Sequence, residues 1–128
     1  MRDRLVHPFR VFTLDKANGA VPEVARLTSR VQERLDDLRQ AYDEADPQAS
    51  RDLEAETRDL LSSWQGSILA IGAEPKGIFT VDFRSPDPNV LWCWTVNEPE
   101  ITHRHFTWES FKDRVDIGDG RRAWPGSN

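Results

Sequence analysis

The sequence predicts an α+β fold, in which a long antiparallel helical hairpin precedes a small three-stranded antiparallel β-meander. Over residues 14–71 the apolar side chains recur every three or four positions, which is the spacing of a helix that buries one face. Over residues 78–106 they alternate with polar ones, as in half-buried strands. The length of 128 residues is usual for one domain. We therefore expect a single domain, 1–128, with the hairpin over 12–72, the meander over 78–106, and a short helix with a mobile tail over 107–128.

The first helix is expected to begin after Thr13, because a threonine hydroxyl can accept a hydrogen bond from an unpaired backbone N–H of the first turn. The helical pattern continues to Tyr42, but Pro22 lies inside it. Proline removes one backbone hydrogen bond and kinks a helix. We therefore predict a short helix over residues 14–20 and a bend or restart at Pro22.

The second helix is expected to start after the break at Asp46 and Pro47 and to extend to Ile71, with Gly72 at the position of a C-cap glycine. The two predicted helices have similar lengths and are joined by a short connector. This combination favours an antiparallel helical hairpin.

The predicted hairpin is longer than the predicted sheet. A helix of about 24 residues is roughly 36 Å long. Three strands about 4.8 Å apart form a ribbon less than about 15 Å wide and about 20 Å long, which cannot cover such a hairpin. A second copy of the chain is the simplest cover for the remaining apolar face, so we predict a homodimer through the hairpin.

Composition and charge exclude several classes of protein. The net charge is −5, and residues 13–71 carry twelve acidic and seven basic side chains, which argues against nucleic-acid binding. No apolar run approaches the about 20 residues that a membrane span needs. The N-terminus has no apolar region of a signal peptide, and one cysteine cannot form an internal disulfide. We therefore expect a cytoplasmic protein that binds neither nucleic acid nor membrane.

The last two predicted strands carry tryptophan, cysteine and histidine close together. If their connection has an even number of residues, Trp92 faces His105 and Trp94 faces His103. In that register Cys93 lies on the opposite side of the sheet from His105. An odd number of residues would move both tryptophans to the other face.

Five polar residues in and around these strands are candidate metal ligands. His103 and His105 are two positions apart, so they point to the same side of a strand and could reach one ion. Asp82 near the end of the first strand, with Glu98 and Glu100 in the turn, could complete a set of nitrogen and oxygen ligands. Such a mixed set suits zinc, iron or manganese.

The same residues also have a purely structural interpretation. The two histidines are then half-buried strand residues, Glu98 and Glu100 form an ordinary charged turn, and the tryptophans fill the core or an interface. Cys93 is expected to be buried and inert, because nothing indicates the low thiol pKa that a nucleophile needs. A Cys93/His105 couple is a formal alternative.

Several short motifs occur in a fixed order over residues 12–106. They are Phe12-Thr13-Leu14-Asp15-Lys16-Ala17-Asn18, Val21-Pro22-Glu23-Val24, Gly77 with Val81-Asp82-Phe83, Trp92-Cys93-Trp94, Glu98-Pro99-Glu100-Ile101, and His105. Together they resemble an uncharacterised prokaryotic family, catalogued among the domains of unknown function under the number 2203.

The chain departs from this family at four positions. Asn97 stands where the family usually has glycine, and Arg104 stands where the family usually has an aromatic residue before the matching histidine. Arg84 replaces the proline that often follows the Asp-Phe pair in the family. His103 matches no motif of the family. The resemblance implies a helical hairpin with a small β part and no established activity. It implies that any site contains Asp82, Glu98, Glu100 and His105, whose types suit a metal or a general acid–base pair.

Two functions remain as hypotheses. The first is a non-enzymatic cytoplasmic helical-hairpin module that acts through self-association or protein partners, because the hairpin exposes more apolar surface than the sheet can cover. The alternative is a small metal-binding or hydrolytic domain that uses the carboxylates and the histidine of the β-hairpin. The sequence specifies neither a reaction nor a substrate.

Overall fold

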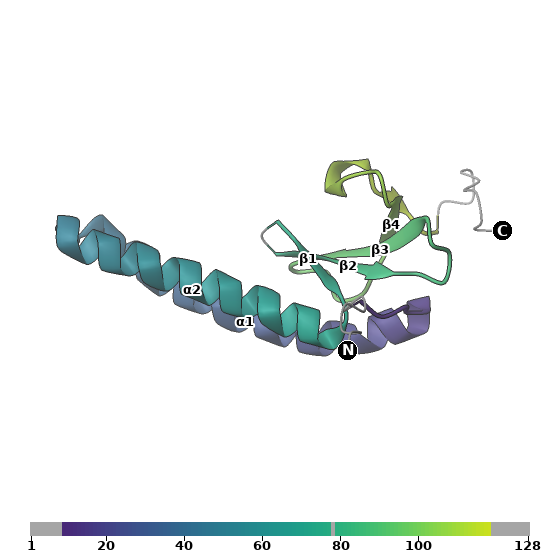
Figure 1. Ribbon diagram of the computed structural model, residues 1–128, viewed down its shortest axis with the longest axis horizontal. Coiled ribbons are helices and arrows are strands. Elements are labelled where there is room, and N and C mark those ends of the chain that lie inside the picture. Colours follow the sequence, from purple (N-terminus) through teal and green to yellow (C-terminus); the bar gives the residue numbers. More distant parts are fainter. Residues whose placement is uncertain (1–8, 78, 119–128) are drawn as a thin grey trace, which may run out of the picture.

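A computed structural model describes residues 9–77 and 79–118 and places two long helices against a β-sheet (Figure 1). Helix α1 spans Leu14–Asp43 and helix α2 spans Pro47–Ile71. The two helices lie side by side, and the sheet packs on one end of the pair. The predicted α+β class is therefore confirmed. Neither described helix combines the length and the apolar content that crossing a bilayer requires.

Helix α1 runs through Pro22 without interruption, so the predicted separate helix over residues 14–20 is wrong. The predicted N-cap is present, since Thr13 Oγ1 accepts a hydrogen bond from the N–H of Lys16 at 3.2 Å. A proline inside a helix costs about 3 kcal/mol. Burial of three side chains around it offsets this cost: Ala17, Val21 and Val24. Figure 1 shows the purple N-terminal part of α1 at an angle to the rest of the helix, as expected for a helix with an internal proline.

Helix α2 begins and ends where the sequence predicted. Asp46 Oδ1 accepts a hydrogen bond from the N–H of Ala49 at 2.8 Å, and Pro47 takes the first helical position. Gly72 forms the C-cap in the left-handed region, with φ of 101°. A Cβ atom at this position would lie 2.6 Å from Cγ of Arg10, so the cap requires glycine.

The sheet is an antiparallel meander of five strands, where the sequence predicted three. In spatial order the strands are β1 (Glu74–Lys76), β2 (Thr80–Arg84), β3 (Val90–Thr95), β4 (His103–Phe106) and β5 (Val115–Asp116). Strand β1 lies in a segment predicted as a connector, and it pairs with β2 after a tight turn at Gly77. Phe79 in this turn has a φ of +73°, and its ring packs edge-on against Trp64 at 5.2 Å. Burial of that ring stabilises the unusual backbone.

Strand β5 and the turn before it lie where the sequence predicted a short helix over residues 107–117. A single 3-10 turn, Phe111–Asp113, forms instead. The Asp113 carboxylate accepts hydrogen bonds from the N–H and the hydroxyl of Ser110 and so closes one turn. Val115 then pairs with Arg104 in the sheet. The predicted tail, residues 118–128, lies outside the described residues except for Gly118.

A buried hydrogen bond joins the two helices where they meet the sheet. Trp64 Nε1 donates to Thr28 Oγ1 at 3.0 Å, and the Thr28 hydroxyl donates to the carbonyl of Val24 at 2.8 Å. Both side chains are buried. Thr28 therefore satisfies an indole N–H that burial would otherwise leave unpaired.

We expect Thr28→Val to lower the free energy of unfolding by about 1–3 kcal/mol, because it leaves the buried indole N–H of Trp64 without an acceptor. Thr57→Val is the matched control. Thr57 also donates to a carbonyl four residues earlier, that of Leu53, but is only partly buried. Urea unfolding of both variants measures the difference. Equal losses in the two variants would contradict the assigned role of Thr28.

Candidate functional site

The pairing of β3 with β4 determines which side chains share a face of the sheet. Leu91 lies opposite His105 and Cys93 lies opposite His103. The register with an even-numbered connection, which paired Trp92 with His105, is therefore wrong. Because side chains alternate along a strand, Cys93 lies on the same face as His105.

Both tryptophans occupy the opposite face, toward the helices, and both are hydrogen-bonded there. Trp92 Nε1 donates to the carbonyl of Phe12 at 2.9 Å, and Trp94 Nε1 donates to the carbonyl of Glu98 at 2.8 Å. The turn that follows β3 contains Asn97 with a φ of +78°, a conformation that asparagine tolerates better than most residues. The N–H of Ile101 then donates to Asn18 Oδ1 of α1 at 2.7 Å. These contacts hold the observed register.

Three buried side chains from adjacent strands meet on the face away from the helices. Asp82 of β2 lies directly opposite Cys93 of β3, and His105 of β4 lies one diagonal step away. The potential ligand atoms of the three side chains all lie within 4.8 Å of one another. Their exposed fractions are 2%, 0% and 2%. A carboxylate, a thiol and an imidazole thus converge in one buried place.

The hydrogen bonds of His105 define its orientation. Its Nδ1 lies 2.7 Å from the carbonyl oxygen of Phe106, which can only accept, so Nδ1 carries the proton. Its Nε2 lies 3.2 Å from both carboxylate oxygens of Asp82. Burial lowers the pKa of His105, and so does the charge of Lys76. The hydrogen bond and charge of Asp82, together with the Phe106 carbonyl, outweigh them and raise this pKa above its ordinary value.

Cys93 is not arranged as a nucleophile. Burial and the nearby charge of Asp82 raise the pKa of its thiol to about 12, although Arg114 acts in the opposite direction. In a cysteine–histidine–acid triad, one ring nitrogen contacts the acid and the other takes the thiol proton. Here Nδ1 of His105 donates to a backbone carbonyl and Nε2 faces Asp82. No ring nitrogen remains to accept the thiol proton.

The other three residues predicted for the site are not among the three side chains that converge. Glu98 forms a two-pronged ion pair with Arg114, at 2.9 and 3.3 Å, and accepts the N–H of Thr95. Glu100 is exposed. His103 lies opposite Cys93 on the same face of the sheet, but it hydrogen-bonds to the hydroxyl of Thr102 at 2.8 Å and is not one of the converging ligands. Of the predicted residues, Asp82 and His105 come together, and their neighbour is Cys93, which the sequence offered only as a formal alternative partner of His105 and not as a metal ligand.

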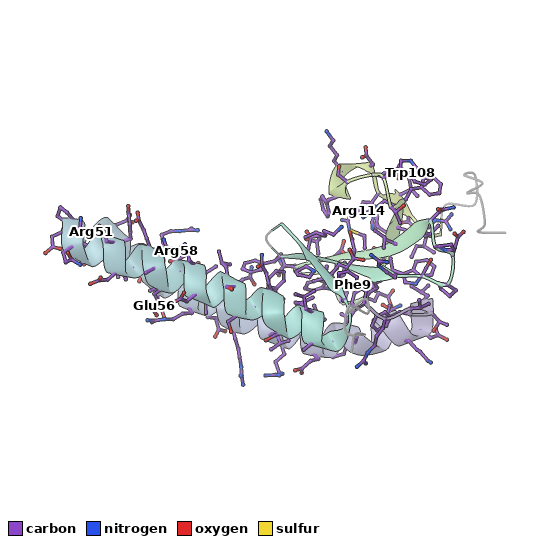
Figure 2. The ribbon with its side chains drawn as sticks, viewed as in Figure 1. Phe9, Arg51, Glu56, Arg58, Trp108 and Arg114 are labelled. Atoms are coloured by element: carbon purple, nitrogen blue, oxygen red, sulfur yellow. The ribbon has the colours of Figure 1, made fainter. Side chains whose placement is uncertain are left out.

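A cavity of about 510 Å³ opens beside the three residues. Asp82 and His105 form part of its wall, with Lys76 and Thr80 on one side and Glu109 on the other. Lys76 Nζ lies 3.5 Å from Asp82 Oδ2 and 3.6 Å from Glu74. Figure 2 shows the segment that carries Trp108 and Arg114 on the side of the sheet away from the helices. This segment covers part of the polar face and leaves an entrance to the site.

The fold and the site define an α+β protein with a helical hairpin and a buried carboxylate–thiol–imidazole cluster on its sheet. Residues 10–117 match the model of a family described as "Uncharacterized conserved protein (DUF2203)", so the chain belongs to that family. The resemblance seen in the sequence motifs is therefore confirmed. Comparisons with curated proteins and with solved structures returned no match.

The raised pKa of His105 predicts how the stability of the metal-free protein depends on pH. A group whose pKa is higher in the folded state contributes stability that is complete below its unfolded value, about 6.5 for histidine. That contribution is lost as the pH rises through the folded pKa. We therefore expect the free energy of unfolding to fall over this range in urea titrations with a chelator present. Asp82→Asn removes the main cause of the raised pKa and should flatten the fall. An equal fall in wild type and variant would exclude the pair as its source.

Proposed function

We propose that the protein binds one divalent metal ion, with zinc preferred, through Asp82, Cys93 and His105. The observation that carries this proposal is the convergence of three ligand-type atoms within 4.8 Å in a buried place. The 3.2 Å separation between His105 Nε2 and Asp82 is close to the roughly 3.3 Å between two ligands of a tetrahedral zinc ion. A small movement of the side chains accommodates an ion between the three.

The surroundings of His105 fit the role of a metal ligand. Metal-binding histidines usually donate their second ring N–H to a carbonyl or a carboxylate, which fixes the ring and its tautomer. His105 Nδ1 has this partner in the Phe106 carbonyl, so Nε2 is the nitrogen directed at the ion. Burial and the charge of Asp82 raise the pKa of the Cys93 thiol to about 12, and the Arg114 guanidinium opposes them, so Arg114 would help to stabilise the thiolate that a metal requires.

The ligand set narrows the choice of metal. Thiolate and imidazole favour zinc and iron over manganese, which prefers oxygen ligands. Three protein ligands are also the number in zinc sites that keep one position open. The affinity should increase with pH, because binding displaces a proton from Cys93 and from protonated His105.

We expect the wild-type protein to bind about one equivalent of zinc, measured by titration calorimetry and by elemental analysis after dialysis. Cys93→Ser and His105→Ala each remove a ligand and should weaken binding more than about 100-fold, beyond the usual effect of an outer-shell change. His103→Ala is the matched control, since it removes a histidine of the same strand that lies opposite Cys93 but is not one of the three converging ligands, and it should bind as wild type does. Absence of stoichiometric metal from the wild type, or equal losses in all three variants, would refute the proposal.

We also propose self-association through the far end of the hairpin, because an apolar groove lies there between α1 and α2. The groove has a volume of about 590 Å³, and its lining includes Leu35, Leu38, Tyr42, Leu53 and Leu61. Figure 1 shows that this end of the hairpin extends beyond the sheet. Leu35, Leu53 and Leu61 are only partly buried in this groove, so association can bury them further.

The charges around the groove support a second copy of the chain as the proposed partner. Arg39 and Arg58 border the groove, and within the described residues neither forms an ion pair. Residues 43–54 connect the two helices and form the start of α2. They carry one basic side chain, Arg51, and five acidic ones: Asp43, Glu44, Asp46, Asp52 and Glu54. If two hairpins packed against each other through these ends, the acidic side chains of one copy would lie beside the arginines of the other copy.

Light scattering after gel filtration tests this association. We expect a dimer of two 14.7 kDa chains that dissociates on Leu53→Glu, because a charge is then placed in the apolar contact. Leu69→Glu is the control, since Leu69 is an exposed leucine of the same helix outside the groove. A wild-type mass of one chain at every concentration would exclude the dimer, and dissociation by both variants would place the contact elsewhere.

A further inference from the structure

We infer that the fourth coordination position of the proposed metal takes a small carboxylate ligand, which Lys76 also binds. The inference rests on the metal site proposed above and adds the class of ligand that the site accepts. It follows from the place of the cavity relative to the three metal ligands and from the charge of its wall.

The open position of the metal would face the cavity. Asp82 and His105 both contribute to the cavity wall, whereas Cys93 does not line it. Cys93 is fully buried on the central strand β3, so it approaches the ion from the sheet. The fourth position of a tetrahedral ion then points away from the sheet and into the cavity. A volume of about 510 Å³ is within the range of small-molecule sites.

The charges around the ion favour an anion at this position. A divalent ion bound by one carboxylate, one thiolate and a neutral imidazole has no net charge. Binding of the ion would neutralise the negative charge of the Asp82 carboxylate, which lies 3.5 Å from Lys76 Nζ. The other acidic neighbour of Lys76, Glu74, lies 2.6 Å from Arg84 Nε. Among the described residues that line the cavity, Lys76 supplies the positive charge that a ligand anion can approach.

Glu109 limits the anion to a small one with a single charge. Glu109 lines the cavity wall, and one of its carboxylate oxygens accepts the N–H of Phe106 at 2.9 Å. A second negative charge on the ligand would approach this carboxylate. Thr80 and Ser110 also line the wall, where their hydroxyl groups are hydrogen-bonded to Thr95 and Asp113 and add no charge. A monocarboxylate matches this arrangement better than a doubly charged anion.

Cobalt-substituted protein titrated with acetate tests the inference, because visible spectra report both the thiolate–cobalt bond and a change of the fourth ligand. We expect a saturable change of the ligand-field bands on adding acetate. Lys76→Met should weaken acetate about fivefold, the effect of one partly exposed ion pair, without weakening cobalt binding. Lys76→Arg should restore it. Lys112→Met is the control, since Lys112 is exposed and does not line the cavity.

The possible outcomes separate the inference from the function on which it rests. A thiolate–cobalt spectrum that acetate does not change would overturn the inference and leave the metal site standing. An acetate response that is equal in wild type and Lys76→Met would remove Lys76 from the site. Absence of any cobalt spectrum would overturn the metal site, and the inference with it.

Discussion

The packing of Trp92 and Trp94 on the side of the sheet that faces the helical hairpin is the constraint on which the rest of the sheet depends. Two large aromatic side chains on one strand must share a face, and only the face toward the helices buries them. Their indole N–H groups reach carbonyls of Phe12 and Glu98, which leaves little freedom for a shift of the strand. Since the side-chain period of a strand is two, this packing alone directs Cys93 to the opposite face.

The opposite face is unusual because it buries polar groups. A buried carboxylate beside a buried imidazole costs free energy unless each group finds a partner. Asp82 and His105 partner each other, and the segment after β4 covers part of them. That segment is tied down by the Glu98–Arg114 ion pair and by the hydrogen bond from Phe106 to Glu109. Replacing such a cluster with apolar residues would often be neutral or stabilising, so its presence favours a role in binding.

The two ends of the hairpin differ in what stabilises them. Near the sheet, Ala17, Val21 and Val24 of α1 and Ile68 of α2 are almost completely buried in the common core. Toward the connector, side chains are more exposed, and the groove is lined by leucines that the sheet does not reach. The contacts there include polar ones such as Tyr42 with Glu54, which contribute little free energy at an exposed position. The far end therefore offers a surface for association, whereas the near end positions the sheet.

The amino-acid sequence by itself determined the elements whose signals are local. Helical spacing, the Thr13 and Asp46 caps and the Gly72 stop are short-range features, and the structure has all of them. It also showed that Asp82 and His105 lie on neighbouring parts of one sheet. Tertiary structure decided the rest, because packing outweighs local preference. In the folded protein α1 continues through Pro22, and β1 and β5 pair with the meander. The β3–β4 register also differs by one residue from the register that paired Trp92 with His105. This shift of one residue places Cys93 beside His105 and leaves Glu98 apart from both. The sequence could not show it, because two paired strands carry no local signal for which of their faces will pack on the core.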